Sequence, residues 1–294
     1  RGCTAWWWVR GQHADPYITD PEIPTPLPCQ RHKLRGVEAL KLYLRNQGYR
    51  RLERQYKVAR IAQAAIEWLE TNYRLDPFFL WVDMWDPHEP FDPPWYDHAL
   101  YADPAYRGDR IIYPQYGRWD YMTPEELRDV RALYAGQVTL VDRWVGYILD
   151  TIEKLGLFKN SLVIWTTDHG HLFGEHDLEG KPGGQLGNLY EVTTRIPLLI
   201  RHPEGAGQGR RVRGLAQPPD ILPTIFEALG IPVPSHVQGR SLWPLVDGGK
   251  GFRKYAFSGR FPPIAGGATR QPGIGHLFDG WAGSERIVEA LTVT

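Results

Sequence analysis

Three short apolar runs, separated by segments of helical periodicity, constrain the fold of this chain most strongly. Residues 78–84 (FFLWVDM), 161–167 (SLVIWTT) and 196–201 (IPLLIR) are rich in aromatic and β-branched side chains, as buried strands are. Strands and helices alternate at the spacing of β-α-β crossovers. We therefore predict an α/β fold, with a mostly parallel (mixed) sheet sandwiched by helices.

Two long segments carry the pattern of helices that cover such a sheet. Apolar residues recur at helical spacing over residues 51–70 (RLERQYKVARIAQAAIEWLE), which predicts an amphipathic helix. Thr123 is followed by Pro124 and Glu126, the combination of an N-cap, a first-turn proline and a capping-box glutamate. A long helix should start there and reach Gly156.

Charge and composition exclude some classes of partner. Lys and Arg together number 34, as do Asp and Glu, so no basic surplus suggests nucleic acid. No apolar stretch reaches the roughly 20 residues that a membrane helix needs, so we expect no membrane partner. Cys3 and Cys29 could form a disulfide or remain thiols.

Both ends of the sequence look cut. The chain begins at Arg1 and stops in an alternating, strand-like run, EALTVT. We expect an α/β core over residues 1–250, with its N-terminal part missing, and the start of a truncated C-terminal subdomain over residues 251–294. The sequence leaves two compartments as alternatives, the cytoplasm or a periplasmic or secreted location. It does not indicate the oligomeric state.

Polar clusters follow two of the predicted strands, at the ends where parallel sheets place their chemistry. Asp168 and His169 come directly after the second strand, and Gly170 could let both side chains turn toward one divalent cation. The alternative is an aspartate that caps the next turn with the histidine hydrogen-bonded beside it. Two ligands do not complete a metal site, so others must come from elsewhere.

His88 and Lys181 are the candidates for contact with an anion. His88 lies between Pro87 and Pro90, and a histidine in such a rigid loop could donate to an anion or protonate a leaving group. Lys181 lies in a glycine-rich loop, EGKPGG, and its ammonium could reach an anionic oxygen. The alternatives are an ordinary polar loop residue and a solvated lysine. We expect His171 to serve mainly in loop packing.

Taken in order, these segments resemble the sulfatase family of the alkaline phosphatase superfamily. The resemblance covers roughly residues 35–250 and rests on several motifs in sequence: FFLWVDMWDPHEPFDPP, the long helix and strand that lead to DHG and a downstream lysine, YEVTTRIPLLIRHPEG, and QPPDILPTIFEALGIPVPSHVQGRSLWPLV. It implies an alkaline phosphatase-like α/β core that hydrolyses a sulfate ester of a small molecule or carbohydrate.

The resemblance also implies a cofactor and residue roles. The family's nucleophile is a formylglycine made from Cys or Ser, and a divalent metal, commonly calcium with Mn²⁺ or Mg²⁺ as alternatives, holds the anion. Asp168 and His169 match metal ligands, although His169 stands where Asn is common. Lys181 matches the lysine that binds the substrate anion, and His88 matches the histidine that contacts the ester.

The sequence departs from the family pattern at its N-terminal motifs. No Cys or Ser is followed by Pro two residues later and Arg four residues later, and the paired N-terminal aspartates are not found. We expect about half of an active site, inactive by itself, from a metal-dependent sulfuric ester hydrolase. The alternatives are a phosphonate monoester or phosphodiester hydrolase and a non-catalytic anion-binding module.

Overall fold

The computed structural model describes residues 5–182, 189–249 and 251–258, which fall into two compact units. The first unit contains residues 5–155 and 171–182, and the second contains residues 156–170 and the described residues from 189 onward. Cys3 lies outside the described residues, as does most of the predicted C-terminal subdomain. The predicted boundary of that subdomain remains a prediction.

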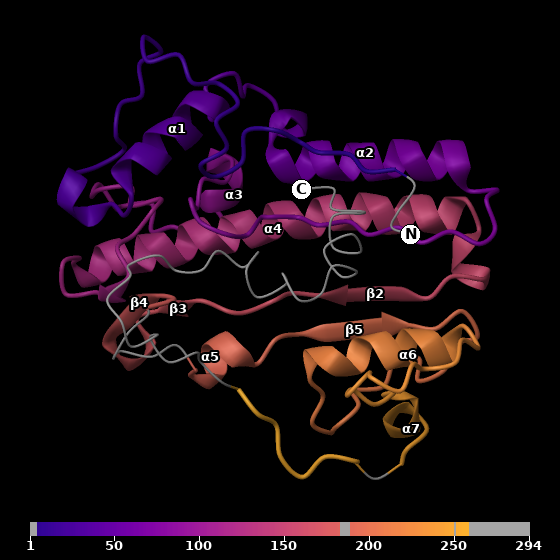
Figure 1. Cartoon of the computed structure of the whole chain (residues 1–294). Coiled ribbons are helices and arrows are strands. Elements are labelled where there is room, and N and C mark those ends of the chain that lie inside the picture. The colour runs from indigo at the N-terminus through magenta and orange to yellow at the C-terminus, as the bar shows by residue number, and fades with distance from the viewer. Residues whose placement is uncertain (1–4, 183–188, 250, 259–294) are drawn as a thin grey trace. The chain divides into compact units, whose positions relative to one another are not determined.

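The first unit is mainly helical (Figure 1). Its helices are η1 (Arg31–Lys33), α1 (Val37–Gln47), η2 (Glu53–Gln55), α2 (Lys57–Asn72), α3 (Trp95–His98), α4 (Pro124–Lys154) and η4 (Glu175–Asp177). The Thr123 hydroxyl accepts from the Glu126 amide at 3.2 Å, and the Thr123 amide donates to the Glu126 carboxylate at 2.9 Å. The predicted capping box at the start of α4 is therefore confirmed.

Helix α2 packs along α4, and the contact buries the apolar face of each helix (Figure 1). Val58 of α2 meets Leu140 and Val141 of α4 in one hydrophobic cluster. The predicted helix over residues 51–70 is thus present, although its regular α-helical part begins later, at Lys57. Residues Glu53–Gln55 form a separate 3-10 turn in front of it.

The predicted strand over residues 78–84 forms no ladder with any described segment, so that strand is not present in the structure. The segment is extended and has two faces. Phe78 packs against Trp68 of α2 with ring centroids 5.2 Å apart, and Met84 joins the cluster between α2 and α4. Phe79 and Trp81 on the opposite face are 58% and 53% exposed. The alternation is that of a strand, but a strand requires a hydrogen-bonded neighbour.

A small antiparallel sheet completes the first unit. Its strands β1 (Gly117–Arg118), β4 (Leu178–Gly180) and β3 (Leu172–Phe173) lie in that order. Phe173 of β3 joins the main hydrophobic core of the unit together with Phe91 and Leu133. The sequence did not predict these strands, because segments of two or three residues carry no periodic pattern.

The second unit contains the other two predicted strands. Its elements are η3 (Leu157–Lys159), β2 (Val163–Thr166), α5 (Glu191–Thr194), β5 (Leu198–Arg201), η6 (Pro218–Asp220), α6 (Ile221–Ala228) and α7 (Trp243–Val246). Strands β2 and β5 pair with each other, and Trp165 lies opposite Leu199.

The predicted α/β class is confirmed, whereas strand direction differs from the prediction. All strand pairs among the described residues are antiparallel, including β2 with β5. A parallel crossover needs a dozen or more residues, usually as a helix. The described residues between β2 and β5 hold no α-helix other than the four-residue α5, too short to return the chain along the sheet.

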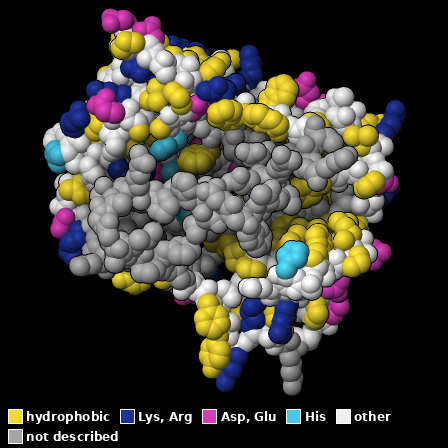
Figure 2. Space-filling view, in the orientation of Figure 1, with side chains coloured by type: hydrophobic (Ala, Val, Ile, Leu, Met, Phe, Trp, Pro, Cys, Tyr) yellow, Lys and Arg dark blue, Asp and Glu magenta, His cyan; other side chains and the backbone are white. Residues whose placement is uncertain are grey.

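Apolar side chains remain on the surface of both units. Figure 2 shows them as patches interrupted by charged residues. The strand pair of the second unit contributes Trp165, which is 42% exposed, and Leu199 opposite it, which is 58% exposed. Among the described residues, no helix has the length and apolar character required to span a bilayer.

Candidate active site

His88 lies in a loop that several hydrogen bonds hold in place. Its amide donates to the Trp85 carbonyl at 3.0 Å, and the Phe91 amide donates to Ile112 at 2.6 Å. Gln137 of α4 donates from its side chain to the His88 carbonyl at 3.2 Å and also to the Asp86 carboxylate. The loop is therefore fastened to α4, which agrees with the rigidity expected from its prolines.

Lys181 follows strand β4 directly. Gly180 at the end of this strand has φ 84°, and a Cβ at that position would overlap the ring of Tyr116. Glycine is needed here because the backbone passes close to an aromatic ring in a left-handed conformation. This close passage brings Lys181 to the neighbourhood of His88, 93 residues earlier in the chain.

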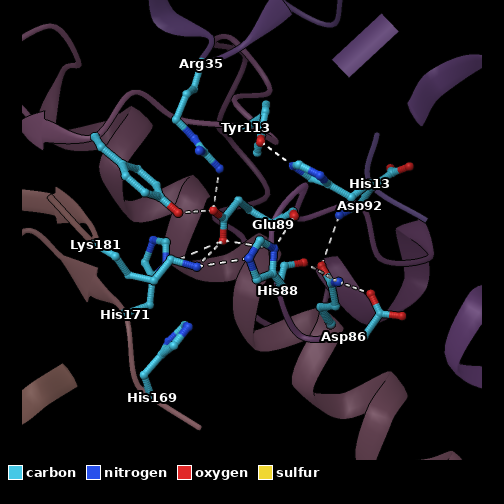
Figure 3. A network of polar contacts seen from close by, with 12 residues as sticks. His13, Arg35, Asp86, His88, Glu89, Asp92, Tyr113, His169, His171 and Lys181 are labelled. Carbon is cyan, nitrogen blue, oxygen red and sulfur yellow. Dashed lines mark hydrogen bonds and ion pairs between the residues drawn. The ribbon is translucent and has the colours of Figure 1, made fainter. Parts of the chain in front are cut away.

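The side chains of His88 and Lys181 are in direct contact (Figure 3). The Lys181 ammonium lies 3.1 Å from Nε2 of His88, and Nδ1 of His88 lies 2.6 Å from the carbonyl oxygen of Glu89. A carbonyl only accepts and an ammonium only donates, so Nδ1 has the proton and Nε2 is the acceptor. Burial lowers the pKa of His88 to about 4, with a further contribution from Lys181. At neutral pH, His88 is an uncharged acceptor.

Glu89 is the centre of this network (Figure 3). Its side chain is buried, and its carboxylate accepts from Arg35 at 2.7 Å, from Lys181 at 3.2 Å and from the Tyr116 hydroxyl. Burial alone would raise the pKa of Glu89, but nearby His88 and Lys181 and the Tyr116 hydroxyl lower it to about 2. Glu89 is therefore an ionised, fully paired carboxylate in the interior.

Sequence reasoning missed Glu89, although it follows His88 in the quoted motif. The only available signal was an acidic residue between a candidate histidine and a proline, inside a loop expected to be rigid. Such a residue is usually exposed. Its burial depends on partners that lie far away in the sequence, Arg35 on one side and Lys181 on the other.

A second buried carboxyl group lies on β4. Glu179 contacts Nε2 of His171 at 3.0 Å through one oxygen, and its other side-chain oxygen has no hydrogen-bond partner in the described part of the chain. Burial raises the pKa of Glu179 to about 9, with a contribution from Glu89, so the group is uncharged at neutral pH. The His171 ring packs on Phe91 and Phe173, as expected for a packing residue, and adds this polar contact.

Aromatic and basic side chains surround the His88–Lys181 pair. The Arg35 guanidinium stacks on the rings of Tyr113 and Tyr116, 4.4 and 4.0 Å from their centroids. Nε2 of His13 lies 2.6 Å from the Tyr113 hydroxyl. Trp85 packs on His88 with ring centroids 4.6 Å apart. These residues belong to no periodic pattern or motif that could have predicted their role.

A small cavity with both polar and apolar lining adjoins His88. Its lining includes Lys57 and Asp86, and its volume of about 20 Å³ is sufficient for roughly one water. Burial lowers the pKa of Lys57 to about 7. Gln12 also lines the cavity, and its side-chain nitrogen and oxygen are buried with no hydrogen-bond partner among the described residues. These polar atoms are suited to bind an ordered water.

Asp168 and His169 form a pair in the second unit. Nε2 of His169 lies 3.4 Å from a carboxylate oxygen of Asp168, and Nδ1 donates to the Gly170 carbonyl at 2.9 Å. Nε2 of His169 and this oxygen of Asp168 therefore lie close together, and each has a lone pair that a cation could accept. Gly170 is required at this turn, because a Cβ would overlap the Val192 carbonyl.

The chemistry of this pair fits part of a metal site. One carboxylate oxygen and one imidazole nitrogen are common ligands of divalent cations, and their separation permits binding to one ion. The side chains of Asp168 and His169 are 81% and 42% exposed, so both can be reached from solvent. Within the described parts of the chain, no group of three or more His, Cys, Asp or Glu residues could hold a metal.

The four predicted site residues therefore form two pairs. His88 contacts Lys181 in the first unit, and Asp168 contacts His169 in the second. A common site made from both pairs remains a prediction.

The family model described as Sulfatase matches residues 7–231, more than half of the chain. The chain belongs to the sulfatase family. It is 26% identical over 207 residues to an arylsulfatase of Clostridium perfringens, a match that covers 64% of this chain and 41% of the relative. It is 33% identical over 129 residues to an N-acetylglucosamine-6-O-sulfatase of Bacteroides thetaiotaomicron, covering 44% of this chain and 21% of the relative.

A solved structure supports the same fold for this sulfatase-family chain. The phosphonate monoester hydrolase of Agrobacterium radiobacter superposes with a TM-score of 0.58 and 28% sequence identity. The match covers 68% of this chain and 44% of that protein. The alkaline phosphatase-like class is thereby confirmed, and the chain spans less than half the length of these relatives.

Proposed function

We propose that this chain contributes His88, Lys181, Asp168 and His169 to the active site of a metal-dependent sulfuric ester hydrolase. The observation on which the proposal rests is the contact at 3.1 Å between the Lys181 ammonium and Nε2 of His88, in a chain of the sulfatase family. The pair combines a cation for an anionic oxygen with a nitrogen that can accept and return a proton.

The two groups would act in succession. An anionic ester oxygen that accepts an N–H of Lys181 competes with Nε2 of His88 for that donor. The negative charge of the ester raises the pKa of the imidazole, because a nearby anion favours the charged form. His88 then takes up a proton from solvent on Nε2 and donates it to the oxygen of the leaving group.

Asp168 and His169 would hold the divalent metal, together with ligands from outside the pair. When bound, the metal offsets negative charge on the ester oxygens. Calcium is our first candidate, and Mn²⁺ and Mg²⁺ are the alternatives. A formylglycine would supply the nucleophile in the family's chemistry, and its sequence motif does not occur in these 294 residues. We infer that the chain alone has no turnover.

A sulfate ester of a small molecule or carbohydrate is the substrate class that we propose. The names arylsulfatase and N-acetylglucosamine-6-O-sulfatase of two relatives support it. A phosphonate monoester is the alternative, supported by the hydrolase that shares the fold. Both esters present one negative charge on a tetrahedral centre, so a lysine and a metal can bind either.

The test compares 4-nitrophenyl sulfate with a 4-nitrophenyl phosphonate monoester. It uses the 294-residue chain and the same chain extended by the sequence that its gene encodes upstream. We expect the extended protein to prefer the sulfate and Lys181→Ala to lower kcat/KM by about 10²- to 10³-fold. Lys41→Ala, a change at a surface lysine, is the matched control. Hydrolysis of neither ester by any form would favour the non-catalytic anion-binding module.

A further inference from the structure

We propose that Glu89 is a positioning and specificity-determining residue, which holds Lys181 against His88 and lowers the affinity of the site for doubly charged esters more than for singly charged ones. The inference rests on the proposed function and adds to it the charge of the substrate. It depends on the contacts of Glu89, on its burial, and on the difference between Glu89 and the neighbouring Glu179.

The positioning role follows from how the two carboxylate oxygens are shared. Oε1 of Glu89 accepts from Arg35 at 2.7 Å and from the Tyr116 hydroxyl. Oε2 lies 3.2 Å from the Lys181 ammonium and 3.4 Å from Nδ1 of His88. Arg35 and Tyr116 thus hold the carboxylate in place through Oε1, and Oε2 in turn holds the Lys181 ammonium. A lysine side chain is flexible and needs such an anchor to occupy one position.

The specificity role follows from charge. Glu89 places a negative charge directly behind the ammonium that would bind the ester. An anion at Lys181 is attracted by the ammonium and repelled by this carboxylate, and the repulsion is proportional to the charge of the anion. The repulsion of a phosphate monoester with two charges is therefore about twice that of a sulfate ester with one. The attraction to the ammonium grows with charge in the same way, so Glu89 reduces the advantage that the doubly charged ester would otherwise have. At these short separations the discrimination is on the order of tenfold.

Glu179 provides the contrast within the same network. Both glutamates are fully buried, but Glu179 contacts His171 and, among the described residues, is paired with neither Arg35 nor Lys181. Because Glu179 is uncharged at neutral pH, it adds no repulsion toward an anion. Replacing the two residues in turn therefore separates the effect of a buried charge from the effect of a buried carboxyl group.

The experiment measures binding and needs no turnover. The ¹⁵N-histidine-labelled chain is titrated at pH 8 with methyl sulfate, which has one charge, and with methyl phosphate, which has two above its second pKa of about 6. The ring nitrogen shifts of His88 report binding and also its tautomer. We expect Glu89→Gln to raise the affinity for methyl phosphate relative to methyl sulfate by about tenfold.

Two further variants complete the design. Glu89→Asp keeps the charge but withdraws the carboxylate from Lys181. It should weaken the binding of both anions several-fold and change the ratio of their affinities less than Glu89→Gln does. Glu179→Gln, the matched control, should alter neither affinity. If Glu89→Gln does not fold, the positioning role is tested with Glu89→Asp. An affinity of Glu89→Asp for both anions equal to that of the wild type would overturn this role.

The remaining outcomes separate this inference from the proposed function. Binding with the same ratio in the wild type and Glu89→Gln, or an equal change of the ratio in Glu179→Gln, would overturn the specificity role alone. Failure of the wild type to bind either anion with a shift at His88 would contradict the proposed function and this inference together.

Discussion

Glu89 and Glu179 show how partners decide the charge of a buried residue. Both are glutamates without solvent exposure in one network, yet the pKa of Glu89 is about 2 and that of Glu179 is about 9. Glu89 has Arg35 and Lys181 within hydrogen-bond distance. Glu179 is hydrogen-bonded to an imidazole, and its other oxygen has no partner among the residues that the structure describes. Ion pairing outweighs the cost of burial in the first case only.

The raised pKa of Glu179 predicts that Glu179→Gln increases the free energy of unfolding relative to the wild type, and that this increase grows with pH. Between the ordinary value of 4.5 and the folded value of about 9, the folded state binds a proton that the unfolded state lacks. The wild type therefore loses about 1.4 kcal/mol of unfolding free energy per pH unit as pH rises through this window. Glutamine does not titrate. The unfolding free energy of the variant should therefore rise relative to that of the wild type by about 1.4 kcal/mol per pH unit.

Urea unfolding at pH 5.5, 7 and 8.5 measures this gain. Glu38→Gln, at an exposed glutamate of α1, is the control and should give a nearly constant difference. A Glu179→Gln difference that is the same at all three pH values would contradict an uncharged Glu179 in the folded protein.

The candidate site was predictable only in part from individual residues. The sequence suggested His88 and Lys181 for one anion, and the structure brings them into contact although each lies in its own loop. The role of His88 differs from the expectation, since its Nε2 accepts from Lys181 and must gain a proton before it can donate. Glu89 and Arg35 were not predicted, because their pairing depends on three-dimensional proximity that a local pattern does not contain.

Helix α4 shows what a local pattern can determine at the scale of an element. Its cap, first-turn proline and periodic apolar residues all lie within the helix itself, and the structure confirms where it begins. The small strands β1, β3 and β4 depend on pairing across the chain and were missed. Residues 78–84 have the alternation of a strand but no described neighbour, and pairing cannot be deduced from alternation.

The capping box predicts a defined stability effect at Thr123. Thr123→Ala should lower the unfolding free energy by about 1 kcal/mol, because the Glu126 amide loses the side-chain acceptor that it now has at 3.2 Å. Thr123→Ser keeps the oxygen and should stay within a few tenths of a kcal/mol of the wild type. Denaturant unfolding of the three proteins measures the effect, and equal losses in both variants would contradict the cap.

At the scale of the whole molecule, the described donors predict weak metal binding. Asp168 and His169 offer one carboxylate and one imidazole, whereas calcium usually binds six to eight oxygens. We expect calorimetric titration of the 294-residue chain with calcium to show no micromolar binding, and Asp168→Ala to behave as the wild type does. Micromolar binding that Asp168→Ala abolishes and Asp142→Ala preserves would demonstrate a complete site within these residues.

Helix α4 is attached to both segments that carry the anion-binding pair. Gln137 in its middle donates to the His88 carbonyl, and Arg131, six residues earlier, donates to the Phe173 carbonyl in the hairpin that leads to Lys181. Displacement of the helix therefore moves both segments in the same direction. Thermal fluctuations of His88 and Lys181 should be correlated, and the distance between the two groups should vary less than the position of either one.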